Sequence, residues 1–247
     1  MSRDIAGPSL RDRLRRFTTA RVSLGRVGSA LPTSALLDFQ LAHARSRDAV
    51  HAGLDEDAIR AALDGESVVS VASQAGDRQT YLMRPDLGRR LRPDDRKRLE
   101  ASRSQLAIVL ADGLSATAVQ AHGPALAKAL ISRAAGWRTG PIVIARQARV
   151  ALGDDVGEAL GADLVVILIG ERPGLSAADS LGAYLTWTPT PGRVDAERNC
   201  VSNIRPPHGL GIDDAADEIM RIAHSARLLG RTGVAMKSGG QALEMGR

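Results

Sequence analysis

Two side chains in the second half of the chain could take part in chemistry or bind a ligand. Glu171 directly follows an apolar run at residues 164–169 and stands in a charged turn at residues 170–174. A carboxylate there can act as a general acid or base, accept a hydrogen bond from a ligand, or pair with Arg172. Cys200 could be a nucleophile, but no histidine lies near it in sequence. A lone cysteine is more often a small, partly buried side chain.

The other candidates do not form a recognisable catalytic or metal-binding set. The five histidines are scattered, and His43 and His51 stand about two turns apart on one predicted helix, too far to share a metal ion. The chain has no G-x-S-x-G, H-E-x-x-H or Walker sequence and no paired cysteines. The sequence therefore predicts no catalytic residue and no metal ligand here, and it favours a subunit that binds a ligand within a complex.

Apolar runs that alternate with helical patterns indicate the elements that hold these residues. Three runs predict buried strands, at residues 106–110, 142–145 and 164–169. Three other stretches predict helices, at residues 115–133, 154–161 and 213–229, the second of them capped by Asp154. Strands that alternate with helices form a parallel sheet covered by helices, so the predicted fold class is α/β.

Ligands in such a sheet bind beyond the carboxyl ends of the strands. The segments that follow the three strands should meet there, at residues 112–115, 146–150 and 170–174. A polar loop predicted around Asn199 and Cys200 could join them. Glu171 is therefore expected at the ligand-binding edge of the sheet.

The chain divides into three predicted parts. Residues 1–65 read as a helical N-terminal arm, residues 66–235 as the α/β domain and residues 236–247 as a flexible tail. Within the arm, Leu37 and Leu41 stand at helical spacing, yet no helix there has enough apolar surface to be stable alone. The arm must therefore pack on this chain's own sheet or on a partner. Short strands are predicted at residues 68–72 and 81–83.

Composition limits the classes of function. The chain has 33 basic and 28 acidic residues, and only 2% of its residues are aromatic, which disfavours single-stranded nucleic-acid binding. Its single cysteine excludes an internal disulfide and favours a reducing compartment. No apolar run reaches the roughly 20 residues of a membrane span. The N-terminal residues also lack the apolar core of a signal peptide. We expect a soluble, intracellular protein that binds neither nucleic acid nor membrane.

Several motifs resemble the small (light) subunit of ethanolamine ammonia-lyase. They occur in the order of that family and cover most of the chain: LPT at 31–33, LAHAR at 41–45, RDAVH at 47–51, ARQARV at 145–150, IGERPGL at 169–175 and RNCVSNIR at 198–205. The resemblance implies a Rossmann-like domain in an adenosylcobalamin-dependent enzyme that converts ethanolamine to acetaldehyde and ammonia by a radical route. A large subunit would hold the substrate and the catalytic residues, and the two would form a hetero-oligomer, inactive when separated.

The resemblance also implies which residues of this chain bind the cofactor. Matched motif to motif, the family's cobalamin-binding positions are Val150, Glu171 and Cys200. The sequence D-x-H-x-x-G is absent, so no histidine of this chain should ligate cobalt. The resemblance further implies a cytoplasmic enzyme housed in the bacterial microcompartment for ethanolamine utilisation.

Two other functions remain open on the residues alone. One is a nucleotide-binding oxidoreductase on the α/β sheet, which the lack of G-x-G-x-x-G after a strand disfavours. The other is a basic accessory protein for nucleic acid, which the interspersed acids disfavour. The order of the motifs favours the lyase subunit over both.

Overall fold

The structure is a computed structural model that describes residues 13–14, 17–18, 20–22, 24–99 and 103–236 of the 247-residue chain. Apart from residue 236, the predicted tail lies outside the described residues. No helix in the described part of the chain is long and apolar enough to cross a membrane.

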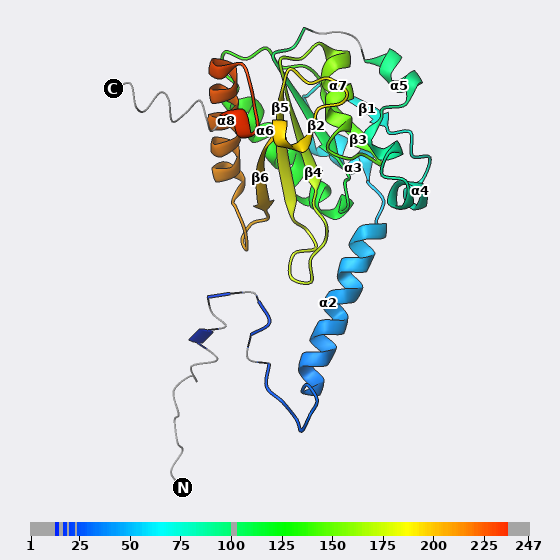
Figure 1. Ribbon diagram of the computed structural model, residues 1–247, viewed down its shortest axis with the longest axis vertical. Coiled ribbons are helices and arrows are strands. Elements are labelled where there is room, and N and C mark those ends of the chain that lie inside the picture. Colours follow the sequence, from blue (N-terminus) through cyan, green and yellow to red (C-terminus); the bar gives the residue numbers. More distant parts are fainter. Residues whose placement is uncertain (1–12, 15–16, 19, 23, 100–102, 237–247) are drawn as a thin grey trace, which may run out of the picture.

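A mixed six-stranded sheet forms the centre of the molecule (Figure 1). Its spatial order is β1-β3-β2-β4-β5-β6, and the strands are β1 (Val68–Ala72), β2 (Leu106–Ala111), β3 (Ile142–Arg146), β4 (Leu164–Gly170), β5 (Leu181–Trp187) and β6 (Asn199–Ile204). The first four in this order are parallel, whereas β5 and β6 are each antiparallel to their neighbour. The α/β class is confirmed.

The expectation of a wholly parallel sheet is wrong for β5 and β6. A parallel neighbour needs a crossover connection, usually a helix, to carry the chain back to the starting edge. The segment between β4 and β5 contains no helix. The chain therefore turns at the carboxyl end of β4, and β5 pairs with it in the opposite direction.

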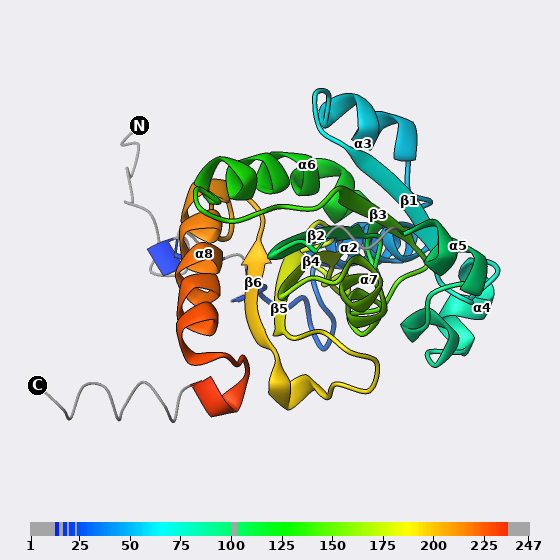
Figure 2. The same cartoon turned by 90° about the horizontal axis from the view of Figure 1, so that it is seen from above.

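Helices cover both faces of the sheet (Figure 2). On one face lie α3 (Glu56–Ala62), α6 (Ala116–Arg133) and α8 (Ile212–Leu229); on the other lie α5 (Pro93–Arg98) and α7 (Leu152–Leu160). The core between these layers is built almost entirely of Leu, Ile, Val and Ala, as the low aromatic content requires. On the α7 side, Cys200 and Ser202 of β6 remain exposed, so this part of the sheet is open.

The long helix α2 (Thr33–His51) projects away from the sheet (Figure 1). Only Ala49 of this helix is buried, and Leu37 and Leu41 are about half exposed. His43 and His51 both lie on it, as predicted. Its C-terminal half meets the body at the carboxyl edge of the sheet, where the Ser46 hydroxyl donates to the Gly174 carbonyl oxygen at 2.9 Å.

Three local expectations are wrong. Residues 81–83 form no strand but belong to α4 (Arg78–Met83), because the Asp77 carboxylate accepts the Thr80 N–H at 2.7 Å and starts a helix. Asp154 does not cap α7; it is buried inside that helix. Residues 199–200 form no loop, because they pair with β5 as the start of β6.

Short 3-10 helices complete the described chain, at η1 (Leu87–Arg89) and η2 (Asp195–Glu197). With α5, the first of them occupies the charged stretch that precedes β2. The ion pairs of α5 explain this arrangement: Arg96 pairs with Glu158 of α7, and Arg98 pairs with Asp95. The pair of Arg96 with Glu158 joins the connector to α7, whereas the pair of Arg98 lies within α5 itself.

Candidate functional site

The carboxyl ends of β2 and β4 lie side by side where the chain direction through the sheet reverses. From β2 the chain crosses to β3 on one side, and from β4 it continues to β5 on the other. This is the switch point at which open α/β sheets bind ligands. The turns after the two strands are in direct contact, since Leu114 N–H donates to the Gly170 carbonyl oxygen at 2.9 Å.

Two glycines allow this close approach. Gly113 has φ +56°, and a Cβ there would stand 2.2 Å from the Gly170 carbonyl oxygen. A Cβ on Gly170 would stand 2.0 Å from the Ser115 carbonyl oxygen. No larger residue fits either position without displacing backbone.

Asp112 fixes the loop that carries Val150. Its two carboxylate oxygens accept the backbone N–H groups of Gln147 and Ala148 at 2.8 and 2.9 Å. Burial raises the pKa of this carboxyl, while the two N–H groups and Arg78, whose Nη1 lies 3.7 Å away, lower it. The loop between β3 and α7 is thereby bound to the end of β2, as the sequence predicted.

Glu171 follows β4 and turns toward β5 and β6. Its Oε2 accepts the Ser180 hydroxyl at 2.5 Å and the Asn203 N–H at 3.4 Å, and its Oε1 accepts the Ser202 hydroxyl. Among the described residues it forms no ion pair, so the alternative of a salt bridge to Arg172 does not hold. The carboxylate is instead held by neutral donors.

Cys200 stands on β6 opposite Tyr184 of β5. Cys200 as a whole is exposed, but its sulfur is partly buried, and this burial raises the pKa of the thiol. The charge of the Glu171 carboxylate raises it further. The Tyr184 hydroxyl opposes these effects by hydrogen bonding to the sulfur. Desolvation and the nearby Cys200 raise the pKa of Tyr184 to about 12. Both groups are therefore protonated and neutral near pH 7.

A cavity of about 160 Å³ brings two of the predicted residues together. Val150 and Glu171 both line it, and Tyr184 connects it to Cys200. Its floor is formed by Gly113, Ile169 and Gly170 at the carboxyl ends of the strands. Val150 and Glu171 therefore lie at the carboxyl edge of the sheet, whereas Cys200, level with Ile167 in the middle of β4, lies beside them on the open face.

An unusual ring contact supports one side of this cavity. Arg78 and Arg149 each place a guanidinium carbon 4.7 Å from the centroid of the Tyr81 ring. Arg149 also donates to the Tyr81 carbonyl oxygen at 3.2 Å. Its buried Nε has no hydrogen-bond partner among the described residues. Arg149 is therefore held against Tyr81 on one side of the cavity.

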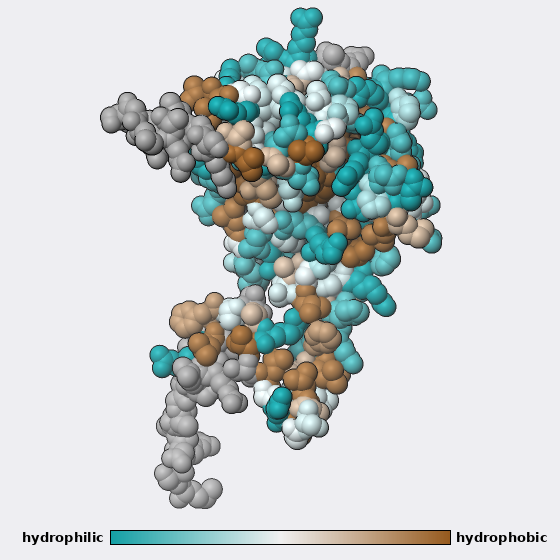
Figure 3. Space-filling model, viewed as in Figure 1, coloured by the Kyte–Doolittle hydropathy of each residue, from teal (hydrophilic) through white to brown (hydrophobic). Residues whose placement is uncertain are grey.

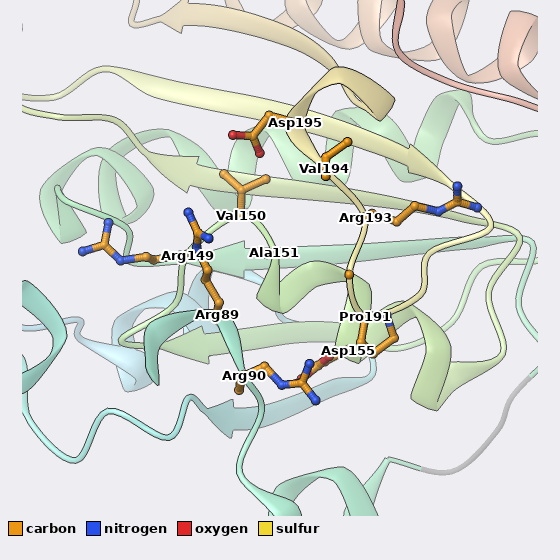
Figure 4. A pocket seen from close by; sticks show the side chains of 11 residues that line it. Arg89, Arg90, Arg149, Val150, Ala151, Asp155, Pro191, Arg193, Val194 and Asp195 are labelled. Atoms are coloured by element: carbon orange, nitrogen blue, oxygen red, sulfur yellow. The ribbon is translucent and has the colours of Figure 1, made fainter. Parts of the chain in front are cut away.

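A second, larger cavity of about 500 Å³ adjoins the first, because Arg149 and Val150 line both. Figure 4 shows its lining, to which η1, the start of α7 and the segment 191–195 contribute. Arg90 is turned toward Asp155, with Nε and Oδ2 3.7 Å apart, and Arg193 is turned away from the hollow. The two cavities therefore share one wall, formed by Arg149 and Val150.

A buried ion pair links the segments that carry Val150 and Cys200. Arg198, just before β6, donates from both terminal nitrogens to the Asp154 carboxylate of α7, each at 2.7 Å. The side chains are 2% and 0% exposed. The pair fixes the start of β6 against α7.

Comparison with known proteins identifies the family. The family model for the ethanolamine ammonia-lyase light chain (EutC) matches residues 9–237. The chain belongs to this family. It is 55% identical over 232 residues to the ethanolamine ammonia-lyase small subunit of Bradyrhizobium diazoefficiens, which covers 91% of this chain and 88% of that protein. The same-named protein of Rhodopseudomonas palustris is 52% identical over 236 residues, 93% and 90% of the two chains.

The resemblance inferred from the sequence motifs is therefore confirmed. Ethanolamine ammonia-lyase light chains are subunits of a lyase, and their name implies a larger partner chain. The cofactor roles of Val150, Glu171 and Cys200 stay predictions. In the part of the chain that the structure describes, no three His, Cys, Asp or Glu side chains gather as a metal site would need.

Several residues of the candidate site were not predicted from the sequence. Ser180 and Ser202 contact Glu171, and Tyr184 and Arg149 line the smaller cavity. A partial signal existed for Ser202: Cys200 and Ser202 are exposed on either side of the buried Val201, as in a half-buried strand. Nothing in sequence spacing indicates the contact of Ser180 with Glu171.

Proposed function

We propose that this chain is the small subunit of an adenosylcobalamin-dependent ethanolamine ammonia-lyase, a carbon–nitrogen lyase that converts ethanolamine to acetaldehyde and ammonia. It forms one wall of the cofactor site with Val150, Glu171 and Cys200. The observation that carries the proposal is that Val150 and Glu171, far apart in sequence, line one cavity, and that Tyr184 joins this cavity to Cys200 on the neighbouring strand. Bound adenosylcobalamin supplies the radical chemistry.

The side chains at this edge fit the periphery of a corrin. A corrin carries amide side chains, which both donate and accept hydrogen bonds. Glu171 presents a fixed acceptor, and the guanidinium groups of Arg149 and Arg172, which line the same cavity, carry N–H donors. Val150 and the neutral Cys200 and Tyr184 offer surfaces without charge. These residues bind and orient the cofactor and exclude water from its rim.

The size of the cavity supports a shared site. A pocket that encloses a drug-sized ligand has roughly 300–1,000 Å³, whereas the cavity beside Glu171 has about 160 Å³ and the face over Cys200 is open. This chain can cover only one side of a cofactor as large as cobalamin. The large subunit then covers the other side and binds ethanolamine with the catalytic residues.

The exposed apolar side chains of α2 support a partner chain. Large hydrophobic residues gather over this helix and the turn before it (Figure 3), namely Val27, Leu31, Leu36, Leu37, Phe39 and Leu41. Monomeric proteins rarely expose contiguous apolar patches of this kind. The C-terminal end of the helix lies at the edge that holds the site, because Ser46 contacts Gly174 and Arg78 contacts the Val50 carbonyl oxygen. A large subunit at that edge would reach α2.

Co-expression tests the function directly. The chain is produced with the large subunit from the same genome, loaded with adenosylcobalamin and assayed for acetaldehyde formed from ethanolamine. We expect activity from the complex and none from either chain alone. Activity of the large subunit alone, equal to that of the complex, would sink the proposal.

Paired substitutions test the contribution of α2. Leu37→Ser with Leu41→Ser should weaken the complex about tenfold or more, because two half-exposed side chains lose apolar contact with the partner. Arg45→Ser and Arg47→Ser, on the same helix, serve as controls for loss of charged rather than apolar surface. Subunit dissociation is measured by analytical ultracentrifugation. Equal effects of the two pairs would argue against an apolar interface.

Cys200→Ala tests the role of the thiol. It should weaken cobalamin binding modestly, about twofold to fivefold, because an apolar contact of one sulfur is lost. Turnover at saturating cofactor should be unchanged. Normal cobalamin binding with complete loss of turnover would contradict the role of this residue.

The site of action in the cell is a further part of the proposal. The family implies a cytoplasmic enzyme inside the microcompartment for ethanolamine utilisation. Co-sedimentation of the complex with purified shells tests this, and recovery only in the shell-free fraction would exclude it.

A further inference from the structure

We propose that Ser180 and Ser202 are positioning residues that hold Glu171 as a pure hydrogen-bond acceptor, so that this edge selects ligand groups that donate N–H, such as primary amides, over carboxylates. The inference rests on the proposed cobalamin site and deepens it. It assigns a positioning role to Ser180 and Ser202 and a ligand preference to Glu171.

The contacts of Glu171 come from two different segments. Ser180, buried just before β5, donates to Oε2 at 2.5 Å, and Glu171 N–H donates back to the Ser180 carbonyl oxygen at 2.9 Å. Ser202 of β6 donates to Oε1, and Asn203 N–H approaches Oε2 at 3.4 Å. Both carboxylate oxygens are therefore fixed from the β5 and β6 side.

Gly182 leaves the space that the Glu171 carboxylate occupies. A Cβ on Gly182 would stand 2.9 Å from Oε1 of Glu171 and 3.2 Å from its Cγ. Any side chain at this position would push the carboxylate off the two serines. The space that glycine leaves open is filled by Glu171 itself.

The charge of Glu171 and its number of free acceptor positions decide which ligand group fits. An ionised carboxylate has about four acceptor positions and no donor. Three are used by Ser180, Ser202 and Asn203, so at least one remains for the cavity that Glu171 lines. Arg149 and Arg172 line the same cavity, but among the described residues Glu171 forms no ion pair with either of them. A ligand N–H is therefore attracted, whereas a ligand carboxylate at the same position is repelled.

The first test measures positioning in the complete complex of both subunits. Hydroxocobalamin is titrated and followed by its absorbance. Ser180→Ala and Ser202→Ala should each weaken binding about tenfold, the effect of losing one well-oriented hydrogen bond to a charged group. Ser202→Thr keeps the hydroxyl and should bind within about twofold of the original protein. Ser225→Ala removes an exposed hydroxyl from α8 and should have no effect.

The second test measures selectivity. Cobalamin derivatives in which one propionamide has been hydrolysed to an acid are titrated one isomer at a time. One isomer should bind the original complex at least about tenfold more weakly than hydroxocobalamin. In Glu171→Gln the ratio for that isomer should fall toward one, because the charge that repels the acid is gone. This ratio is measured within each protein, so it does not depend on small losses of stability.

The outcomes separate the inference from the function on which it rests. If the original complex binds no cobalamin, the proposed function and the inference both fail. If it binds cobalamin but the serine variants bind equally well, or no isomer is discriminated, the inference alone is wrong. Thermal melting of each variant identifies misfolding, and Ser202→Thr then still compares a retained hydroxyl with a lost one.

Discussion

Arg198 offers a sharp test of how the two halves of the site are held together. Its guanidinium makes two 2.7 Å contacts with the Asp154 carboxylate and further donates to the Thr186 hydroxyl at 2.8 Å and to the Arg193 carbonyl oxygen at 2.9 Å. Arg198→Met keeps much of the apolar stem and removes the charge. Asp154 is then left buried without an ion-pair partner, and only the more distant charge of Arg193 still acts on it.

The expected loss follows from that unpaired charge. Removing one partner of a buried ion pair costs about 3–5 kcal/mol. For a chain of this size each kcal/mol corresponds to roughly 2–4 °C in Tm, so Tm should fall by about 6–20 °C. Replacing both partners, Arg198→Met with Asp154→Leu, should restore much of this stability, since apolar pairs of similar volume often substitute for buried ion pairs.

The pH dependence of the stability of Arg198→Met provides a second, independent test. Burial raises the pKa of Asp154, and Arg198 opposes that shift. Without Arg198 the folded-state pKa lies further above the unfolded value of about 3.9. The contribution of Asp154 to the stability of the variant is then fully present below the unfolded pKa and is lost as pH rises through the raised folded-state pKa. The deficit relative to the original protein should therefore be larger at pH 8 than at pH 5.

Thermal and urea unfolding of the full chain at both pH values measure these effects. Arg221→Met is the matched control, because its pair with Glu218 is exposed and should contribute less than about 1 kcal/mol. Cobalamin binding by the complex should also weaken in Arg198→Met, since the pair joins the segments of Val150 and Cys200. A loss below about 1 kcal/mol, or equal losses in the single and double variants, would refute the reasoning.

Three further predictions concern the same sheet edge. Gly113→Ala should destabilise the chain by about 2 kcal/mol or more, seen as a lower urea midpoint, because its Cβ would lie 2.2 Å from the Gly170 carbonyl oxygen; unchanged stability would contradict the close packing. Asp112→Asn should cost about 2 kcal/mol, because an amide NH₂ must face one of the two N–H groups that the carboxylate accepts, and equal unfolding curves would exclude this. Since its pKa is raised, Cys200 should react with iodoacetamide more slowly than free cysteine at pH 8, as followed by mass spectrometry, and an equal rate would argue against the shift.

The central strands could be predicted because each is a continuous apolar run buried on both faces. β2, β3 and β4 lie within about one residue of the predicted ranges, and α8 runs from Ile212 to Leu229 as its amphipathic pattern indicated. Local signals failed where the tertiary environment decided. Residues 81–83 look like a strand by composition, but the Asp77 cap and the packing of Tyr81 between two arginines stabilise α4. The helical arm and the domain boundary at residues 65–66 stay predictions.

The α/β class and the family could be read from the amino-acid sequence, because apolar periodicity and contiguous motifs are local properties of the chain. The same motifs named Val150, Glu171 and Cys200 as candidate cofactor residues. The tertiary structure decided what surrounds those residues. Cys200 lies on a strand because β5 supplies its hydrogen bonds, and Glu171 is held by Ser180 and Ser202 rather than by Arg172. These contacts join residues 9 and 31 positions apart. They exist only after the chain has turned at the end of β4 and paired antiparallel with itself, which no local pattern encodes.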